Sequence, residues 1–136
     1  MGGGSGYLSI AARRLLPTYD FKWTVIESES MASAYSEFTD ASGIQWIGVD
    51  DDISDRYHVG IISCTLQYLE KPFSVLKQYS RLCDYLILMR IPFVDSVSDV
   101  VTRQTFIEGI YAQVNASWPA WFFWPAYPRP PRPASP

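Results

Sequence analysis

The glycine residues near the start of the chain are the residue type best suited to binding a nucleoside or a phosphate. Gly2, Gly4 and Gly6 follow a G-x-G-x-G spacing, directly ahead of a segment with helical apolar spacing. Glycine has no side chain, so backbone N–H groups can approach a ligand closely, and a helix N-terminus adds partial positive charge. The loop therefore predicts half of a binding site, with a flexible chain start as the alternative interpretation.

An acidic residue, Glu27, ends the next predicted strand, about 20 residues after the glycine loop. An acid at this position can accept hydrogen bonds from ribose hydroxyls, so loop, helix, strand and acid together predict a nucleoside site. The dinucleotide fingerprint G-x-G-x-x-G would need glycine where the chain has Tyr7. The spacing therefore favours S-adenosylmethionine over NAD, and a nicotinamide-dependent oxidoreductase is the less favoured alternative.

The elements that must position these residues alternate along the chain. The predicted strands are 22–27, 44–49, 58–65 and 85–90, with residues 100–107 as a strand or an extended segment. The predicted helices are 7–16, 29–38 and 72–82. This alternation predicts an α/β fold over residues 1–124, with a Rossmann-like open, mostly parallel sheet and flanking helices. Residues 125–136 are proline-rich, and we expect them to form a disordered tail.

Composition narrows the classes of function. The chain has 136 residues and a net charge of −3. We therefore expect no nucleic-acid partner, which would need clustered Lys and Arg. No apolar run reaches the roughly 18 residues that span a bilayer, and no signal-peptide pattern is visible, so a cytoplasmic protein without a membrane span is expected. Two distant cysteines and one histidine make no recognisable ligand set, so no metal site is expected.

Several segments together resemble a class I S-adenosylmethionine-dependent methyltransferase. More narrowly, the chain is similar to a family of methyltransferases often encoded among bacterial surface-polysaccharide biosynthesis genes. The matching segments, which span most of the chain, are WTVIES at 23–28, LQYL at 66–69, YLILMRIPF at 85–93, VTRQ at 101–104 and IYAQVNASWPAWFF at 110–123. The resemblance implies S-adenosylmethionine as cofactor and a small-molecule acceptor, with a saccharide or its precursor as one candidate.

The resemblance also implies roles for residues that follow later strands. Asp50 and Asp51 would lie near the adenine, with an ordinary solvated turn as the alternative. Ser63 would contact the cofactor at the end of the strand 58–65. Gln67, just beyond it, is the residue assigned to catalysis, because it would face the methyl group or the acceptor. All four lie on the side where open α/β sheets bind ligands, outside the carboxyl ends of the strands.

The chain departs from the family's pattern at both ends. Members of the family have an apolar strand leading into the glycine loop, where this sequence has Met1, and they continue beyond the aromatic segment. We therefore expect a partial domain lacking the first strand and the C-terminal strands, as a misplaced start codon and a frameshift would produce. We expect such a chain to be unstable or inactive unless the strand is restored, and a non-catalytic remnant is the alternative to an enzyme.

Overall fold

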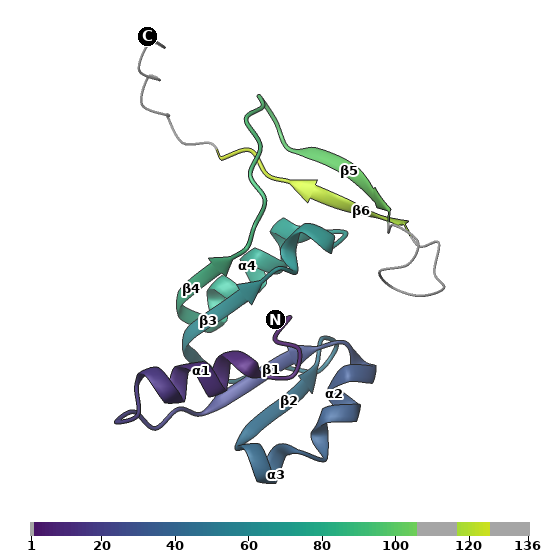
Figure 1. The fold of residues 1–136 in the computed structure, drawn as a ribbon. Coiled ribbons are helices and arrows are strands. Elements are labelled where there is room, and N and C mark those ends of the chain that lie inside the picture. Colours follow the sequence, from purple (N-terminus) through teal and green to yellow (C-terminus); the bar gives the residue numbers. More distant parts are fainter. Residues whose placement is uncertain (1, 106–116, 126–136) are drawn as a thin grey trace.

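A computed structural model describes residues 2–105 and 117–125 (Figure 1). The proline-rich segment from residue 126 and the first part of the segment 110–123 lie outside the described residues. The helices are α1 (Tyr7–Leu15), α2 (Glu29–Ser36), α3 (Thr39–Ser42) and α4 (Pro72–Leu82), with a 3-10 turn, η1, at Leu66–Tyr68. The strands are β1 (Trp23–Glu27), β2 (Ile44–Gly48), β3 (Tyr57–Ser63), β4 (Cys83–Met89), β5 (Val100–Thr105) and β6 (Ser117–Phe122).

The strands form three two-stranded sheets. β1 pairs with β2 in parallel, β3 pairs with β4 in parallel, and β5 pairs with β6 in an antiparallel hairpin. The predicted α/β class and the parallel direction of the two central pairs are confirmed. The single open sheet is not confirmed: among the described residues β1 pairs only with β2 and β3 only with β4. Backbone hydrogen bonds need strands about 4.8 Å apart, and no described strand lies between the two pairs.

Apolar residues bury β1 on both of its faces. Val25 packs with Ala32 of α2 and with Ile44 and Trp46 of β2 in one core cluster. Its neighbour Ile26 belongs to a second cluster. Because successive side chains of a strand point to opposite faces, the two clusters lie on opposite sides of β1. This double burial is typical of strands in parallel sheets.

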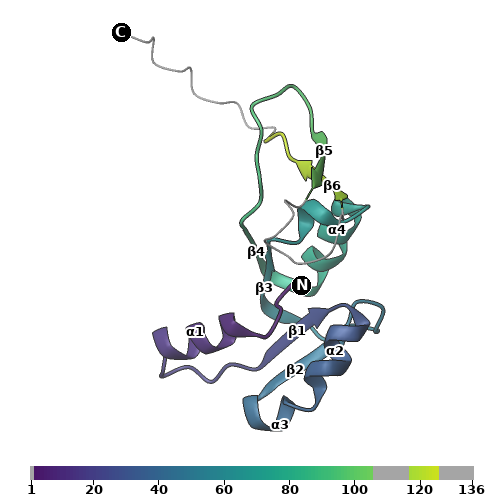
Figure 2. The same ribbon diagram turned by 45° about the vertical axis from the view of Figure 1, so that its right-hand side comes forward.

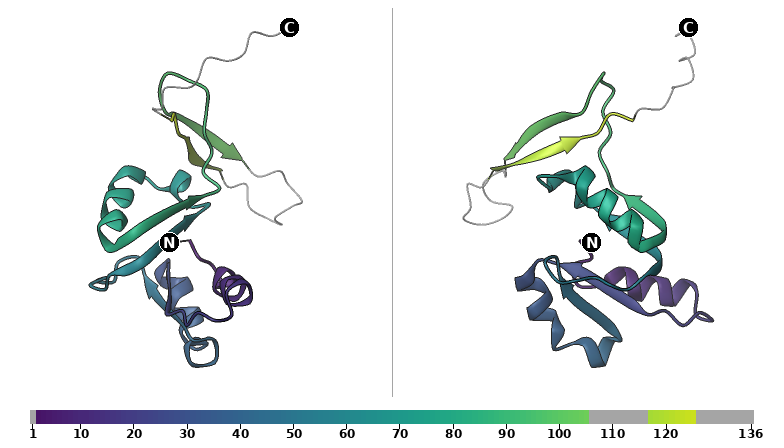
Figure 3. Two further views of the ribbon diagram at one scale, coloured as in Figure 1. Left: turned by 90° about the vertical axis from the view of Figure 1, so that its left-hand side faces the viewer. Right: turned by 180° about the vertical axis from the view of Figure 1, so that it is seen from behind.

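The second core cluster links parts of the chain that share no sheet. Its buried members are Ile26 of β1, Ile62 of β3, Leu66 of η1, Tyr79 of α4 and Phe123 beyond β6. The two parallel pairs are thus held against a common core, although they do not pair with each other. Figure 3 shows α4 beside the β3–β4 pair, and α1 and α2 beside the β1–β2 pair.

The β5–β6 hairpin lies on the α4 side of the molecule (Figure 2). The indole Nε1–H of Trp121 donates a hydrogen bond to the carbonyl oxygen of Leu69, 3.0 Å away. The ring of Trp118 meets the ring of Tyr68 edge-on, with centroids 6.2 Å apart. These contacts attach the hairpin to η1 and therefore to the end of β3. None of the helices in the described part of the chain has the length and apolar character to cross a membrane.

Candidate functional site

A cavity of about 410 Å³ opens where the carboxyl ends of β1 and β3 meet the glycine loop. Small-molecule sites in proteins commonly have volumes of about 300–1,000 Å³. We call this space the glycine-loop cavity. Its lining residues come from the loop and from the chain that leaves β1, β2 and β3. They are Gly2, Gly4, Glu27, Ser28, Val49, Ser63, Cys64, Thr65 and Leu69.

Gly2 and Gly4 of the glycine loop line this cavity, whereas the predicted site residue Gly6 does not and packs against Ile44 of β2. Gly4 has a φ of +51°, which L-residues with a side chain rarely adopt. A Cβ atom built on Gly4 would have no heavy atom within 4 Å, so this face of the backbone is open. At Gly2 the reverse holds, since a Cβ atom there would overlap the Thr65 hydroxyl. Glycine is therefore required at position 2 because Thr65 packs against its backbone. At position 4, glycine leaves the backbone accessible to a ligand.

The Glu27 carboxylate joins the loop to the end of β1. Its Oε1 accepts a hydrogen bond from the backbone N–H of Gly4 at 2.8 Å, and its Oε2 accepts one from the N–H of Ser28 at 3.3 Å. The predicted convergence of the glycine loop and Glu27 on one crevice is confirmed by this contact and by the shared cavity. A carboxylate offers about four lone-pair positions, so about two are left for donors from a ligand.

The end of β3 forms the facing wall of the cavity. Ser63, predicted from the sequence, lines it and is nearly buried. Cys64 follows with a φ of +54°, which turns the chain out of the strand. The Thr65 hydroxyl donates to the carbonyl oxygen of Ser63 at 2.9 Å. Cys64 and Thr65 were not among the site residues predicted from the sequence, because the predicted strand 58–65 included both of them, whereas β3 ends at Ser63.

Gln67 lies behind this wall and does not line the cavity. Only 4% of the residue is exposed, and its Nε2–H donates to the Cys64 sulfur at 3.5 Å. Its Oε1 has no hydrogen-bond partner among the described residues. The side chain that the sequence assigned to catalysis therefore reaches the cavity only through Cys64. Its catalytic role stays a prediction.

Asp50 and Asp51 are also outside the glycine-loop cavity, where Val49 takes the corresponding position. The N–H of Asp50 donates to Glu29 Oε1 at 3.2 Å, and Asp51 Oδ2 accepts from the N–H of Gly48 at 2.6 Å. These hydrogen bonds close the turn after β2. The structure thus separates both residues from the glycine loop and Glu27, and their contact with an adenine stays a prediction.

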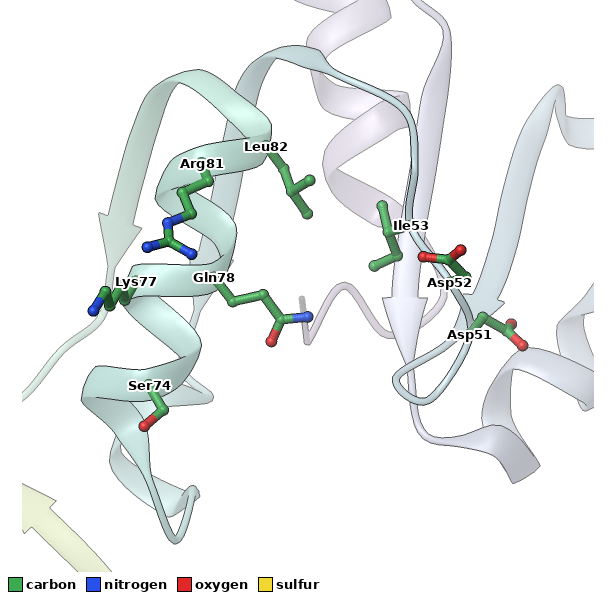
Figure 4. A pocket seen from close by; sticks show the side chains of 8 residues that line it. All are labelled: Asp51, Asp52, Ile53, Ser74, Lys77, Gln78, Arg81 and Leu82. Atoms are coloured by element: carbon green, nitrogen blue, oxygen red, sulfur yellow. The ribbon is translucent and has the colours of Figure 1, made fainter.

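A second cavity, of about 470 Å³, lies between this turn and α4 (Figure 4). Asp51, Asp52 and Ile53 line one side. The α4 side carries the cationic side chains of Lys77 and Arg81, and the remaining lining residues are Ser74, Gln78 and Leu82. None of the lining residues of the glycine-loop cavity belongs to this set. The two cavities are therefore distinct.

Two ionisable side chains with a shifted pKa lie apart from both cavities. Burial raises the pKa of the Tyr79 phenol, which belongs to α4 and packs in the core that also contains Ile62 of β3. Burial is also the main cause that raises the pKa of the Cys83 thiol at the start of β4. Neither residue lines the glycine-loop cavity. In the part of the chain that the structure describes, no group of His, Cys, Asp and Glu side chains forms a metal site.

Comparisons with protein-family models, curated protein sequences and solved structures found no match to this chain.

Proposed function

We propose that this protein binds S-adenosylmethionine in the glycine-loop cavity and belongs to the Rossmann-like methyltransferases. One observation carries the proposal: the hydrogen bond between the Gly4 N–H and Glu27, which joins the loop and the strand-end acid in one cavity. Loop and acid are useful for a nucleoside only when they face the same space. The segments that resemble class I methyltransferases support the same cofactor.

The chemistry of the cavity fits the nucleoside part of this cofactor. Glu27 keeps lone pairs that can accept hydrogen bonds from two ribose hydroxyls. The open face of Gly4 lets a ligand approach the backbone without meeting a side chain. Val49 and Leu69 add apolar lining for a ring system. The cavity thus combines a few polar groups with apolar surface, as small-molecule sites commonly do.

When bound, the cofactor supplies a methyl group on a positively charged sulfur, already activated for in-line displacement. The protein then needs mainly to hold the acceptor in line, because proximity and orientation alone can supply much of the rate. Ser63, Cys64 and Thr65 form the polar wall that faces Glu27 across the cavity. We propose that this wall orients the acceptor. A saccharide or its precursor is the acceptor class that the sequence resemblance favours.

Calorimetric titration with S-adenosylhomocysteine tests the proposal. The proposal predicts that the unsubstituted chain binds, in contrast to the inactive chain expected from the departures of its two ends from the family's pattern. It also predicts weaker binding to Glu27→Gln, by about tenfold or more, because a hydrogen bond to a charged group contributes about 1.5–3 kcal/mol. Glu29→Gln is the matched control, since Glu29 bonds the Asp50 N–H outside the cavity. Equal losses of affinity in Glu27→Gln and Glu29→Gln would contradict the proposal. Binding of NAD in place of S-adenosylhomocysteine would also contradict it.

A further inference from the structure

The Cys64 thiol lies where a small reactant can reach it. The residue is half-buried and lines the glycine-loop cavity, in the wall formed at the end of β3. The chain has one other cysteine, Cys83, which is also half-buried and lies outside this cavity. The class of exposure therefore does not separate the two thiols, and their neighbours decide how each of them reacts.

The side-chain amide of Gln67 is the neighbour of the Cys64 sulfur. Its Nε2–H donates to the sulfur at 3.5 Å. Its Oε1 is bonded to the same carbon atom, so it lies at the same end of the side chain, and it has no hydrogen-bond partner among the described residues. Only 4% of Gln67 is exposed, so this oxygen does not face bulk solvent. Because a buried acceptor without a donor is costly, the sulfur lies beside an oxygen that lacks a donor.

The lack of a donor restricts which modification of the sulfur fits. Oxidation by hydrogen peroxide converts a thiol to a sulfenic acid, whose S–O–H group brings an O–H donor to the sulfur. A nitroso group brings no donor. A mixed disulfide with an anionic thiol such as glutathione would add negative charge to a cavity that the Glu27 carboxylate also lines. Hydrogen peroxide is small and uncharged, so this carboxylate does not repel it.

We propose that Cys64 is a site of reversible oxidation by hydrogen peroxide, and that Gln67 Oε1 accepts the hydrogen bond of the sulfenic acid formed there. The sulfur attacks one oxygen of the peroxide and the O–O bond breaks. The sulfur is oxidised by two electrons while the peroxide is reduced. The departing hydroxide takes the proton of the thiol and leaves as water. The proposal does not rest on the proposed function.

The fold keeps this sulfenic acid from forming a disulfide within the chain. Cys83 begins β4, whereas Cys64 follows the last residue of β3 and bonds Met89 at the other end of β4. The seven residues of β4 span about 20 Å, whereas a disulfide needs Cα atoms within about 7 Å of each other. The chain has no third cysteine. A thiol from outside the chain therefore reduces the sulfenic acid, which makes the modification reversible.

The test treats the reduced full chain with hydrogen peroxide in the presence of dimedone, a diketone that traps sulfenic acids. Peptide mass spectrometry measures trapping at Cys64 and at Cys83 separately. We expect trapping at Cys64 to be faster by about tenfold or more. Cys64 lines the cavity, whereas burial raises the pKa of the Cys83 thiol and so lowers its fraction of reactive thiolate. Equal rates, or faster trapping at Cys83, would overturn the proposal.

A substitution of Gln67 tests the role of its Oε1. An acceptor for the O–H hydrogen stabilises the neutral sulfenic acid and so slows further oxidation to a sulfinic acid, which proceeds through the anion. Gln67→Met keeps a side chain of similar size and removes both amide atoms. We expect the sulfenic acid at Cys64 to convert to sulfinic acid about tenfold faster in this variant, measured by mass spectrometry under excess peroxide.

Gln78→Met is the matched control, since Gln78 is exposed on α4 and does not line the glycine-loop cavity. Equal lifetimes of the sulfenic acid in Gln67→Met and Gln78→Met would overturn the proposal. If the thermal melt shows that Gln67→Met does not fold, the lifetime at Cys64 of the unsubstituted chain is compared in buffer and in denaturant, which separates the amide from the sulfur. We then expect a lifetime about tenfold shorter in denaturant, and an unchanged lifetime would overturn the proposal.

Discussion

Gly4 is the residue at which backbone conformation and ligand access are most directly linked. Its φ of +51° makes alanine unfavourable there, by about 1–2 kcal/mol of unfolding free energy. The space around its Cβ position is open, so the added methyl group would also project toward the glycine-loop cavity. We expect Gly4→Ala to lower the free energy of unfolding and to weaken binding of S-adenosylhomocysteine, measured by denaturant unfolding and by calorimetry.

Gly43→Ala is the matched control for this prediction. Gly43 has a similar φ of +64° at the end of α3 and does not line the glycine-loop cavity. The control variant should lose a comparable amount of stability and keep its ligand affinity. A similar loss of affinity in both variants would mean that the Gly4 effect acts through stability alone.

Residue types predicted part of the site, and local geometry decided the rest. Glycine spacing and a strand-end acid were sufficient to predict Gly4 and Glu27, because those positions depend on the regular alternation of strands and helices. Gln67 follows a left-handed residue, Cys64, and lies within the short turn η1. In such a turn a shift of one position changes which side chain faces the cavity, and neither periodicity nor composition reports that shift.

At the scale of elements, Trp121 makes a polar contact that attaches the β5–β6 hairpin to the site. The hydrogen bond from Trp121 to the Leu69 carbonyl fixes β6 against the end of η1, and Leu69 lines the glycine-loop cavity. We expect Trp121→Phe to reduce the free energy of unfolding by about 1 kcal/mol, because one hydrogen bond is lost. Trp124→Phe is the control in denaturant unfolding, since Trp124 is exposed and bonds Asp99 through its backbone N–H. A larger effect at Trp124 would show that Trp121 does not hold the hairpin.

The helix α4 carries a group that makes stability depend on alkaline pH. Burial raises the pKa of Tyr79 above its ordinary value of 10.0. Near that value the unfolded chain loses the phenolic proton while the folded chain keeps it. The stability that this difference provides is complete below pH 10 and decreases as the pH rises toward the folded-state pKa. Denaturant unfolding measures the free energy of unfolding at pH 9 and at about pH 11. Between these two pH values, Tyr79→Phe should lose less of this free energy than the unsubstituted chain. An identical loss in both chains would contradict this role of Tyr79.

The elements themselves were largely predictable from the sequence. Apolar runs located β1, β2, β3 and β4, since the strands of parallel sheets carry continuous apolar runs that differ from helical spacing. In the structure β4 nevertheless leaves Tyr85, Ile87 and Leu88 exposed. The bounds of these strands in the structure differ from the predicted bounds by a few residues. The segment predicted as 100–107 is the strand β5 at Val100–Thr105. The antiparallel partner β6 was not predicted, because Pro119 and the aromatic run SWPAWF have no alternating pattern.

At the scale of the whole molecule, strand order depends on contacts that no local pattern records. Periodicity predicts that β1 and β3 are parallel strands, but not which strand lies beside each edge. Both pairs pack on the core that contains Ile26, Ile62 and Tyr79, so side chains and not backbone hydrogen bonds hold β1 beside β3. The Gly2 N–H bonds the carbonyl oxygen of Ile26, and Gly2 packs against Thr65 beyond β3, so the position of the glycine loop depends on how the two pairs are packed together.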